Sequence, residues 1–496
     1  TCAKSIVTPR FGAPASRSPF AQIYPATTRI FGHPEVKVVA LSRGEGFETI
    51  FVRLDAVGVF AQLRTEIVRA ASARVGRDLD DAILIGATHT HSGPGRVLNT
   101  GTSEASFFDI IVDKFFPDLY ARFVDDIAAT IEAALADARP ARLGTAVTLC
   151  PDGHNDRRCE DGETYTNDTT PMLAVERDGV VDALVLAYPV HGTVLGIDEL
   201  HLSQDVSGVI EQAVEDRFEH PVEVVMFNSW GADMSPSSPA LEERDVASRG
   251  GGYDRMWRVG AVVADDVHAA LGELAWEEEP RLELSTVRVP IDRERIGYDP
   301  GVFPFEFGGV YCGTDSGTCD DPVPLTGIDR ACIPFSETFP APTQVDVTVG
   351  RVGPFALVTW PGEPGTRLAE HVVAEVEALG HEGPTLFLGY TQDYLGYSIL
   401  EEEWWYGGYE ASGALWGPRQ GSYLAERIAE AWGGWASGGA VADLRPALEP
   451  FPYLVDSPYV PAAASAFGTW AVEAPETLAR SEVLTVAVRG GDQIGR

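Results

Sequence analysis

Residues 82–95 read AILIGATHTHSGPG, a short apolar run followed directly by two histidines and a Gly/Pro loop. The apolar run has the length and composition of a buried strand. Side chains two apart on an extended strand share a face, so His89 and His91 are expected to project together where the strand ends. Two adjacent imidazoles suit one metal ion, or one metal ligand beside one acid/base group. A purely structural role is the alternative interpretation.

Apolar runs alternate with amphipathic stretches on both sides of this segment. The runs predicted to be strands are 36–41, 49–54, 82–87, 183–188, 222–227, 355–360 and 385–388. The stretches predicted to be helices are 58–75, 118–137, 206–217, 255–274, 367–379 and 421–431. This mixture predicts an α/β fold, a large mixed sheet with helices packed against it.

The composition changes twice along the chain. Residues 291–337 are rich in Gly, Pro, Asp and Cys and are predicted to be a long irregular insertion. A Pro-rich stretch and two short strand-like runs follow residue 438, and two strands alone do not make a stable domain. The predicted units are a catalytic domain over 1–438, a linker over 439–464, and the incomplete start of a small β-domain over 465–496.

The charge balance excludes some classes of partner. Asp and Glu number 74 against 37 Lys and Arg, giving a formal net charge of −37. Such a surface repels phosphate backbones and gives no electrostatic attraction to anionic lipids, so we expect no nucleic-acid partner and at most peripheral membrane contact. The negative charge also disfavours a phosphatase, because the substrates of phosphatases are anionic. No run approaches the roughly 18 apolar residues of a membrane helix.

The cysteines and the first residue of the chain indicate the compartment in which the protein is found. The six cysteines are at positions 2, 150, 159, 312, 319 and 332. Cys150 with Cys159 and Cys312 with Cys319 are close in sequence within polar loops, which is typical of disulfides in an oxidising compartment. None forms a CxxC pair, which disfavours zinc binding by cysteine. The chain starts at Thr1 without Met, as a processed precursor would, and we expect a secreted or periplasmic protein.

Further candidate residues follow other predicted strands. His191 follows the run 183–188, at a strand end where α/β proteins often place site residues. His201, in a polar loop, is a less favoured substitute. Ser235 lies in a Gly-containing turn after the run 222–227, without the G-x-S-x-G pattern of a nucleophile elbow.

Two more segments carry groups suited to a site. Glu363 stands between two Pro/Gly pairs in the run WPGEPGT, a rigid setting suited to a metal ligand, although a solvated Glu363 is the alternative. Tyr394 and Tyr397 form a Tyr-x-x-Tyr pattern, and Tyr409 follows it. Aromatic clusters of this kind usually belong to a core or to the wall of a substrate site.

Taken in order, these segments resemble the neutral ceramidase family of zinc amidases. The resemblance depends mainly on the THTHSGPG run and on the Tyr-x-x-Tyr pattern followed by Tyr-Glu-Ala and Gly-Pro. It implies a single zinc ion and a lipid-like N-acyl substrate of the ceramide class, with no protein partner. The implied zinc ligands are His89, His191, Glu363 and Tyr397.

The resemblance also implies the other groups of the active site. These are His91, Ser235, Tyr409 and an arginine. We place the arginine at Arg157, and an alignment shifted by one residue would place it equally well at Arg158. The segment from about residue 466 resembles the first strands of the family's C-terminal immunoglobulin-like domain. The sequence leaves open whether Ser235 or a water is the nucleophile, whether the substrate is another N-acyl compound, and whether the chain is an inactive lipid-binding relative.

Overall fold

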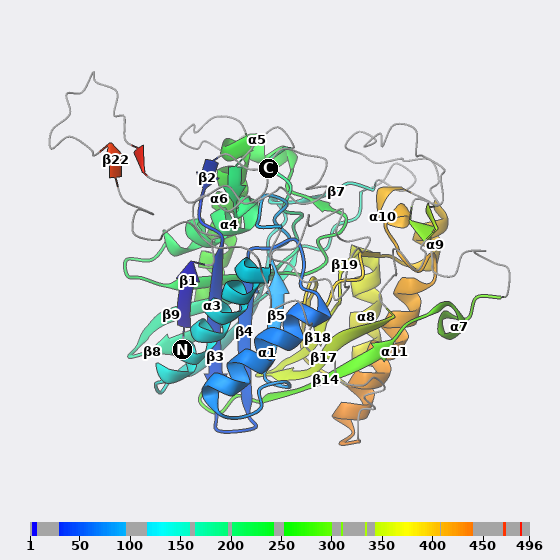
Figure 1. Cartoon of the computed structure of the whole chain (residues 1–496), viewed down its shortest axis with the longest axis horizontal. Helices are drawn as coiled ribbons and strands as arrows, with labels where there is room; N and C mark the ends of the chain where they lie inside the picture. The colour runs from blue at the N-terminus through cyan, green and yellow to red at the C-terminus, as the bar shows by residue number, and fades with distance from the viewer. Residues whose placement is uncertain are drawn as a thin grey trace.

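Three β-sheets lie between helices in the computed structural model of the chain (Figure 1). The structure describes residues 2–6, 29–95, 117–158, 164–196, 201–242, 252–299, 309–310, 333–334, 343–406, 408–439, 470–472 and 487–488. The inner faces of the three sheets share one apolar core, to which each sheet contributes Leu, Val and Phe side chains. The arrangement confirms the predicted mixed α/β class, but several sheets take the place of the one large mixed sheet that was expected.

The first sheet carries the histidine motif at one edge. Its order is β1-β3-β4-β5, with β4 and β5 parallel and the other pairs antiparallel. The strands are β1 (Cys2–Ile6), β3 (Glu35–Ser42), β4 (Glu48–Leu54) and β5 (Ile83–Ala87). Helices α1 (Ala61–Val75) and α3 (Pro117–Ala136) pack together and lie in front of this sheet in Figure 1.

The second sheet has five strands in the order β11-β9-β8-β6-β13. They are β6 (Arg142–Leu149), β8 (Thr169–Arg177), β9 (Val180–Tyr188), β11 (Glu223–Asn228) and β13 (Ala275–Glu277). Helices α4 (Asp205–Glu215) and α6 (Gly252–Ala270) contact each other and the outer face of this sheet, where they bury a separate apolar cluster. A short 3-10 helix, Leu271–Glu273, extends α6.

The third sheet continues the layer of the first. Its order is β14-β17-β18-β20, and its strands are β14 (Leu282–Pro290), β17 (Gln344–Val352), β18 (Phe355–Thr359) and β20 (Thr385–Leu388). Helices α8 (Thr366–Ala378) and α11 (Gln420–Ala436) pack against it. Just beyond β20, Thr391 forms an antiparallel bridge to Gly86 of β5, which joins the two sheets edge to edge.

Short elements complete the described part of the chain. The helices are α5 (Pro239–Glu242), α7 (Arg293–Ile296), α9 (Glu401–Tyr406) and α10 (Tyr409–Ser412). The strand pairs are β2 (Arg29–Phe31) with β10 (His201–Ser203), β7 (Asn155–Asp156) with β12 (Met234–Ser235), β15 (Gly309–Val310) with β16 (Ile333–Pro334), β19 (Glu363–Pro364) with β21 (Tyr397–Ser398), and β22 (Trp470–Val472) with β23 (Ala487–Val488).

The predicted elements agree with the observed ones to within a few residues. Strands β6, β8, β14 and β17 were not among them. Most of the expected insertion 291–337 and of the linker 439–464 lies outside the described residues. At the C-terminal end, β22 and β23 form an antiparallel pair, and the immunoglobulin-like assignment remains a prediction. None of the helices that the structure describes is long and apolar enough to cross a membrane.

One expected disulfide is not formed. Cys150 carries a free thiol, fully buried in the core beneath α4 and α6. The pairing of Cys150 with Cys159 is therefore wrong for this structure, because the apolar core encloses the thiol instead of a loop crossing it. The side chains of Cys2, Cys312, Cys319 and Cys332 lie outside the described residues, so the other pairings stay predictions.

Candidate metal centre

His89 lies just beyond β5 and is held in an unusual backbone conformation. Its φ is 62°, in the left-handed region that residues other than glycine rarely adopt. The expected extended backbone, which would place His89 and His91 on one face of the strand, is therefore wrong at His89. Their rings still meet, because the turn brings the centroids to 4.6 Å. His89 Nδ1 lies 2.6 Å from the carbonyl oxygen of Val57, which fixes the ring orientation.

His191 reaches the same place from the second sheet. It follows β9, and its Nδ1 lies 2.9 Å from the carbonyl oxygen of Gly231. Its backbone N–H donates to the carbonyl of Met234 at 2.8 Å. Gly192 lets the two histidine loops approach, because a Cβ on that residue would lie 2.4 Å from the carbonyl oxygen of His89. The favoured histidine, His191 and not His201, is thus the one beside His89.

Glu363 and Tyr397 are neighbours through backbone pairing. Strands β19 and β21 run parallel with Glu363 opposite Tyr397, which brings segments far apart in the sequence together. Both side chains are buried. The Glu363 carboxylate accepts a hydrogen bond at Oε1 from the hydroxyl of Tyr394, which leaves Oε2 to face the histidines. Glu363 is therefore held in place and is not a solvated turn residue.

Acceptor atoms from these residues converge. His89 Nε2 lies 3.3 Å from His191 Nε2 and 3.1 Å from Glu363 Oε2. The contacts to Val57 and Gly231 assign the ring proton of each histidine to Nδ1, so each Nε2 carries a lone pair. Glu363 Oε2 is buried and accepts no hydrogen bond from any described residue. A cation between these atoms would turn the repulsion among them into attraction, and the site therefore fits a metal ion.

His91 completes a group of three histidines, each of which offers one ring nitrogen within 4.8 Å of those of the other two. Its Nε2 lies 3.0 Å from His89 Nε2, and its side chain is less buried than those of His89 and His191. Burial, then the positive charge of Arg157, lowers the pKa of His191 well below its ordinary value. A neutral His191 is the form that binds a metal. The sequence left open whether His91 is a ligand or an acid/base group, and both are compatible with this position.

Tyr397 lies at the edge of the cluster. Its ring stacks parallel to that of His191, with centroids 6.4 Å apart, and its hydroxyl accepts a hydrogen bond from Arg157 Nη2 at 3.2 Å. Burial, then the charge of Glu363, raises the pKa of Tyr397 well above its ordinary value. Without a cation the phenol therefore keeps its proton. The structure brings Tyr397 beside the other three candidate ligands.

The two candidate arginines share one carboxylate but point differently. Arg157 Nε donates to Glu410 Oε1 at 2.7 Å, and Arg158 Nη1 donates to Glu410 Oε2 at 3.0 Å. The guanidinium of Arg157 lies over the rings of Tyr397 and Tyr409, 6.0 and 5.7 Å from their centroids. Arg158 instead donates to the backbone carbonyl of Glu403 at 2.9 Å. Of the two candidate arginines, Arg157 is therefore the one whose side chain lies at the candidate metal centre.

Ser235 lies on the backbone that joins His191 to Arg157. In the β7–β12 pair, Ser235 is opposite Asn155. One residue before it, Met234 accepts from the backbone of His191, and Asp233 accepts from the backbone N–H of Arg157 at 2.9 Å. Ser235 therefore directly follows Asp233 and Met234, whose backbone carbonyls contact two candidate site residues.

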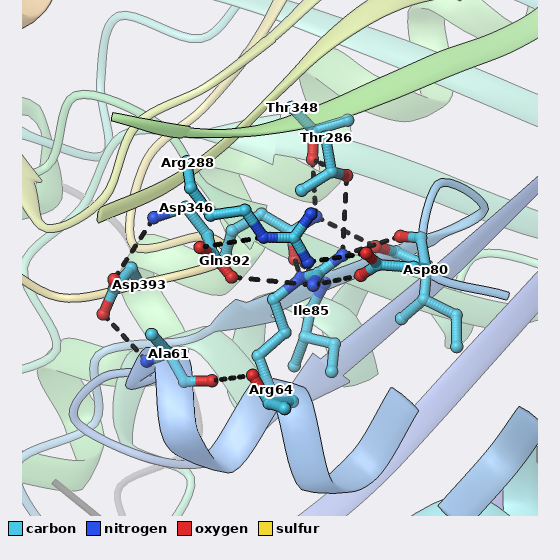
Figure 2. A network of polar contacts seen from close by, with 12 residues as sticks. Ala61, Arg64, Asp80, Ile85, Thr286, Arg288, Asp346, Thr348, Gln392 and Asp393 are labelled. Carbon is cyan, nitrogen blue, oxygen red and sulfur yellow. Dashed lines mark hydrogen bonds and ion pairs between the residues drawn. The ribbon is translucent and has the colours of Figure 1, made fainter. Parts of the chain in front are cut away.

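A buried polar network supports the segment that carries the tyrosines, as Figure 2 shows. Gln392 has a φ of 76°, and its side chain accepts from Ile85 N at 3.1 Å and donates to Thr348 Oγ1 at 2.6 Å. The fully buried Arg64 of α1 donates to Gln392 Oε1 at 3.0 Å and to Asp80 Oδ1 at 2.6 Å. The network fixes the segment after β20 against β5, which ends at the histidine motif.

Sequence reasoning did not assign roles to Tyr394, Glu410, Asp233 or Gln392. Tyr394 and Glu410 lay inside quoted motifs, and their burial was the missing information. Asp233 caps α8 from a distant segment, with its carboxylate accepting from Thr366 N at 3.0 and 3.1 Å. No local sequence signal marks such a contact.

The chain resembles known proteins in sequence and in fold. Residues 37–238 match the family model described as neutral/alkaline non-lysosomal ceramidase, N-terminal. The chain is 23% identical over 433 residues to a neutral ceramidase of Pseudomonas aeruginosa, covering 75% of this chain and 62% of that protein. It is 24% identical over 412 residues to a neutral ceramidase of Mycobacterium tuberculosis, covering 70% and 62%.

A solved structure shares the fold. The crystal structure of neutral ceramidase from Pseudomonas aeruginosa superposes with a TM-score of 0.76 at 18% identity, covering 98% of this chain and 82% of that one. These matches agree with the resemblance that the motifs predicted: residues 37–238 match the neutral/alkaline ceramidase N-terminal model, and the chain is similar in sequence and in fold to neutral ceramidases. The chain spans 62% of the length of the two bacterial relatives.

Proposed function

We propose that this chain is a zinc-dependent amidohydrolase that cleaves the N-acyl amide bond of ceramide-type sphingolipids to a fatty acid and a sphingoid base. The observation that carries the proposal is the convergence of His89 Nε2, His191 Nε2 and Glu363 Oε2 without a proton between them. The family relationship supports the same substrate class, because the matching relatives are named neutral ceramidases.

The donor set suits zinc. Zinc binds imidazole nitrogen and carboxylate oxygen at about 2.0 Å in tetrahedral geometry, which sets ligand atoms about 3.3 Å apart. Distances of 3.3 Å between the two Nε2 atoms and of 3.1 and 4.0 Å from them to Glu363 Oε2 are close to that value. We assign His89, His191, Glu363 and Tyr397 as the ligands. When bound, zinc polarises an acyl oxygen and lowers the pKa of a water toward about 7.

The remaining groups suit amide hydrolysis. In that reaction the carbonyl carbon gains a bond to a water oxygen, the C–N bond breaks, and the leaving nitrogen takes up a proton. His91 lies beside His89 and is only partly buried, a position from which its ring can pass that proton to the amine. Arg157, held by Glu410, and Tyr409 are assigned as donors to the oxyanion. Ser235 is assigned to assist water attack.

Metal analysis and one hydrolysis assay test the proposal. The purified protein should contain about one zinc per chain and should release fatty acid from ceramide, and His89→Ala should remove both properties. Glu430→Gln, an exposed ion-pair residue of α11, is the matched control and should change neither. A zinc-replete protein inactive on ceramides but active on N-acyl amino acids would replace the ceramide proposal with the other N-acyl class.

The nucleophile and the compartment need separate measurements. Ser235→Ala should retain measurable amidase activity, because we assign the attack to water. A covalent acyl-serine detected by mass spectrometry would reverse that assignment. We also propose that the protein is secreted or periplasmic, because we expect a disulfide between Cys312 and Cys319. A free thiol at both positions in protein isolated from its source would contradict it.

A further inference from the structure

Two backbone hydrogen bonds hold Tyr390 in place, one to a residue beside Glu363 and one to a residue near His89. Its backbone N–H donates to the carbonyl of Gly362, next to Glu363, at 2.8 Å. Its own carbonyl accepts from the N–H of Ala87, at the end of β5, at 3.0 Å. Its φ of 52° lies in the left-handed region, where a bulky residue is held only by surrounding contacts.

The ring of Tyr390 lies against the metal cluster. Its centroid is 4.5 Å from that of the His89 ring, and the side chain is fully buried. The Tyr390 ring therefore borders the candidate metal centre.

This hydroxyl has no hydrogen-bond partner among the described residues. The other phenols here differ: Tyr394 donates to Glu363, and Tyr397 accepts from Arg157. A buried hydroxyl without a partner destabilises a fold, whereas phenylalanine would fill the same space without that cost. An unpartnered donor on a ring that borders a site is explained by a ligand atom that it contacts when the site is filled.

We propose that Tyr390 is a substrate-binding residue, whose hydroxyl donates a hydrogen bond to the acyl oxygen of a ligand held between the histidine cluster and Arg157. The inference rests on the proposed function for the kind of ligand, an acyl group. It adds a donor that the sequence motifs did not indicate. It also gives a reason for the strained backbone at this position, since that conformation directs the ring toward His89.

Octanohydroxamate, an acyl compound that binds metals, is the probe for this inference. Its dissociation constant is measured by calorimetry on the zinc-loaded full chain, beside zinc content and the midpoint of thermal unfolding. Tyr390→Phe should keep its zinc and unfold at the same or a higher temperature, yet bind the probe about 3- to 10-fold more weakly. Tyr390→Leu, which also lacks the hydroxyl, should weaken binding at least as much.

Tyr423→Phe is the matched control, because the Tyr423 hydroxyl of α11 donates to the carbonyl of Pro290 at 2.7 Å. It should lower the unfolding temperature and leave binding of the probe unchanged. Equal affinity in wild type and Tyr390→Phe, no binding by wild type, or loss of zinc or of thermal stability in Tyr390→Phe would each overturn the inference. A wild type that binds the probe but cleaves no ceramide would refute only the proposed function.

Discussion

His89 Nε2 and Glu363 Oε2 lie 3.1 Å apart, and the hydrogen bonds around them leave no proton to place between them. The His89 ring proton is at Nδ1, on the carbonyl of Val57, and the other carboxylate oxygen accepts from Tyr394. Two buried acceptors in this position are unfavourable without a cation. The stability of the protein should therefore depend on metal.

Removal of the metal should lower the unfolding temperature, and added zinc should restore it. A ligand at about 100 times its dissociation constant adds about 2.7 kcal/mol to the free energy of unfolding. Differential scanning fluorimetry with a chelator and then a zinc titration measures this. An unfolding temperature that does not respond to zinc would contradict the site.

Glu363→Gln should separate stability from metal affinity. The amide can donate to His89 Nε2, which relieves the contact between acceptors, so the metal-free variant should be at least as stable as the metal-free wild type. Zinc affinity should fall by more than about 100-fold, beyond the loss seen for an outer-shell partner. Thermal unfolding of the metal-free proteins checks the stability, and calorimetric titration with zinc checks the affinity. A variant that binds zinc as tightly as wild type would remove Glu363 from the ligand set.

Glu410 should be the most sensitive carboxylate outside the ligand set. Burial alone would raise its pKa, but Arg157 and Arg158 outweigh burial and lower the pKa below its ordinary value of 4.5. Glu410→Gln leaves the buried Arg158 and the partly buried Arg157 without their counter-charge, which should cost about 3–5 kcal/mol of unfolding free energy. Chemical denaturation measures this, and Glu426→Gln, an exposed partner of Arg427, should cost less than about 0.5 kcal/mol.

The same pair predicts a pH dependence. Because the folded pKa of Glu410 is depressed, its stabilising contribution is present above pH 4.5 and is lost as the pH falls through the folded pKa. The free energy of unfolding of wild type should therefore fall below pH 4.5 more steeply than that of Glu410→Gln. Parallel curves for the two proteins would show that Glu410 does not supply this term.

Asp233 ties the Ser235 loop to the helix that follows Glu363. Its carboxylate accepts from both the backbone N–H and the hydroxyl of Thr366, at the start of α8. Asp233→Ala should cost about 1–2 kcal/mol of unfolding free energy, the usual loss for a helix cap, and should also lower activity by displacing Ser235. Asp292→Ala is the control, because Asp292 caps the short helix α7. Loss of stability with full activity would limit Asp233 to a structural role.

The strands that the sequence predicted are buried on both faces, although β8 is buried in the same way and was not predicted. Runs such as that of β4, in which every residue is buried, leave an uninterrupted apolar signal. Strand β17 lacks this signal, because Asp346 and Thr348 interrupt it. Both are fully buried and lie in the polar network of Figure 2, where Arg64 and Arg288 are close to Asp346. Polar residues on this strand face other buried polar groups, which composition alone does not indicate.

The candidate site shows the same limit. The histidines and Glu363 were predicted because each directly follows an apolar strand and stands in a run rich in Gly or Pro. Their supporting contacts join segments far apart in the chain, as Asp233 joins Thr366, and these depend on how the sheets pack. The two histidines meet as predicted, but the extended backbone expected at His89 was wrong, because His89 takes a left-handed conformation that a local sequence pattern does not reveal.

Cys150 should behave as an unreactive thiol until the protein unfolds. Burial raises its pKa to about 12, so at pH 8 almost none of the reactive thiolate is present, and the core blocks access to it. Iodoacetamide at pH 8 should label Cys150 slowly in the folded protein and fully in denaturant, as read by peptide mass spectrometry. The same spectra test the rejected disulfide, because a non-reduced peptide linking Cys150 to Cys159 would contradict the free thiol of the structure. Labelling of the folded protein at the denatured rate would show instead that the helices α4 and α6 open readily from the sheet beneath them.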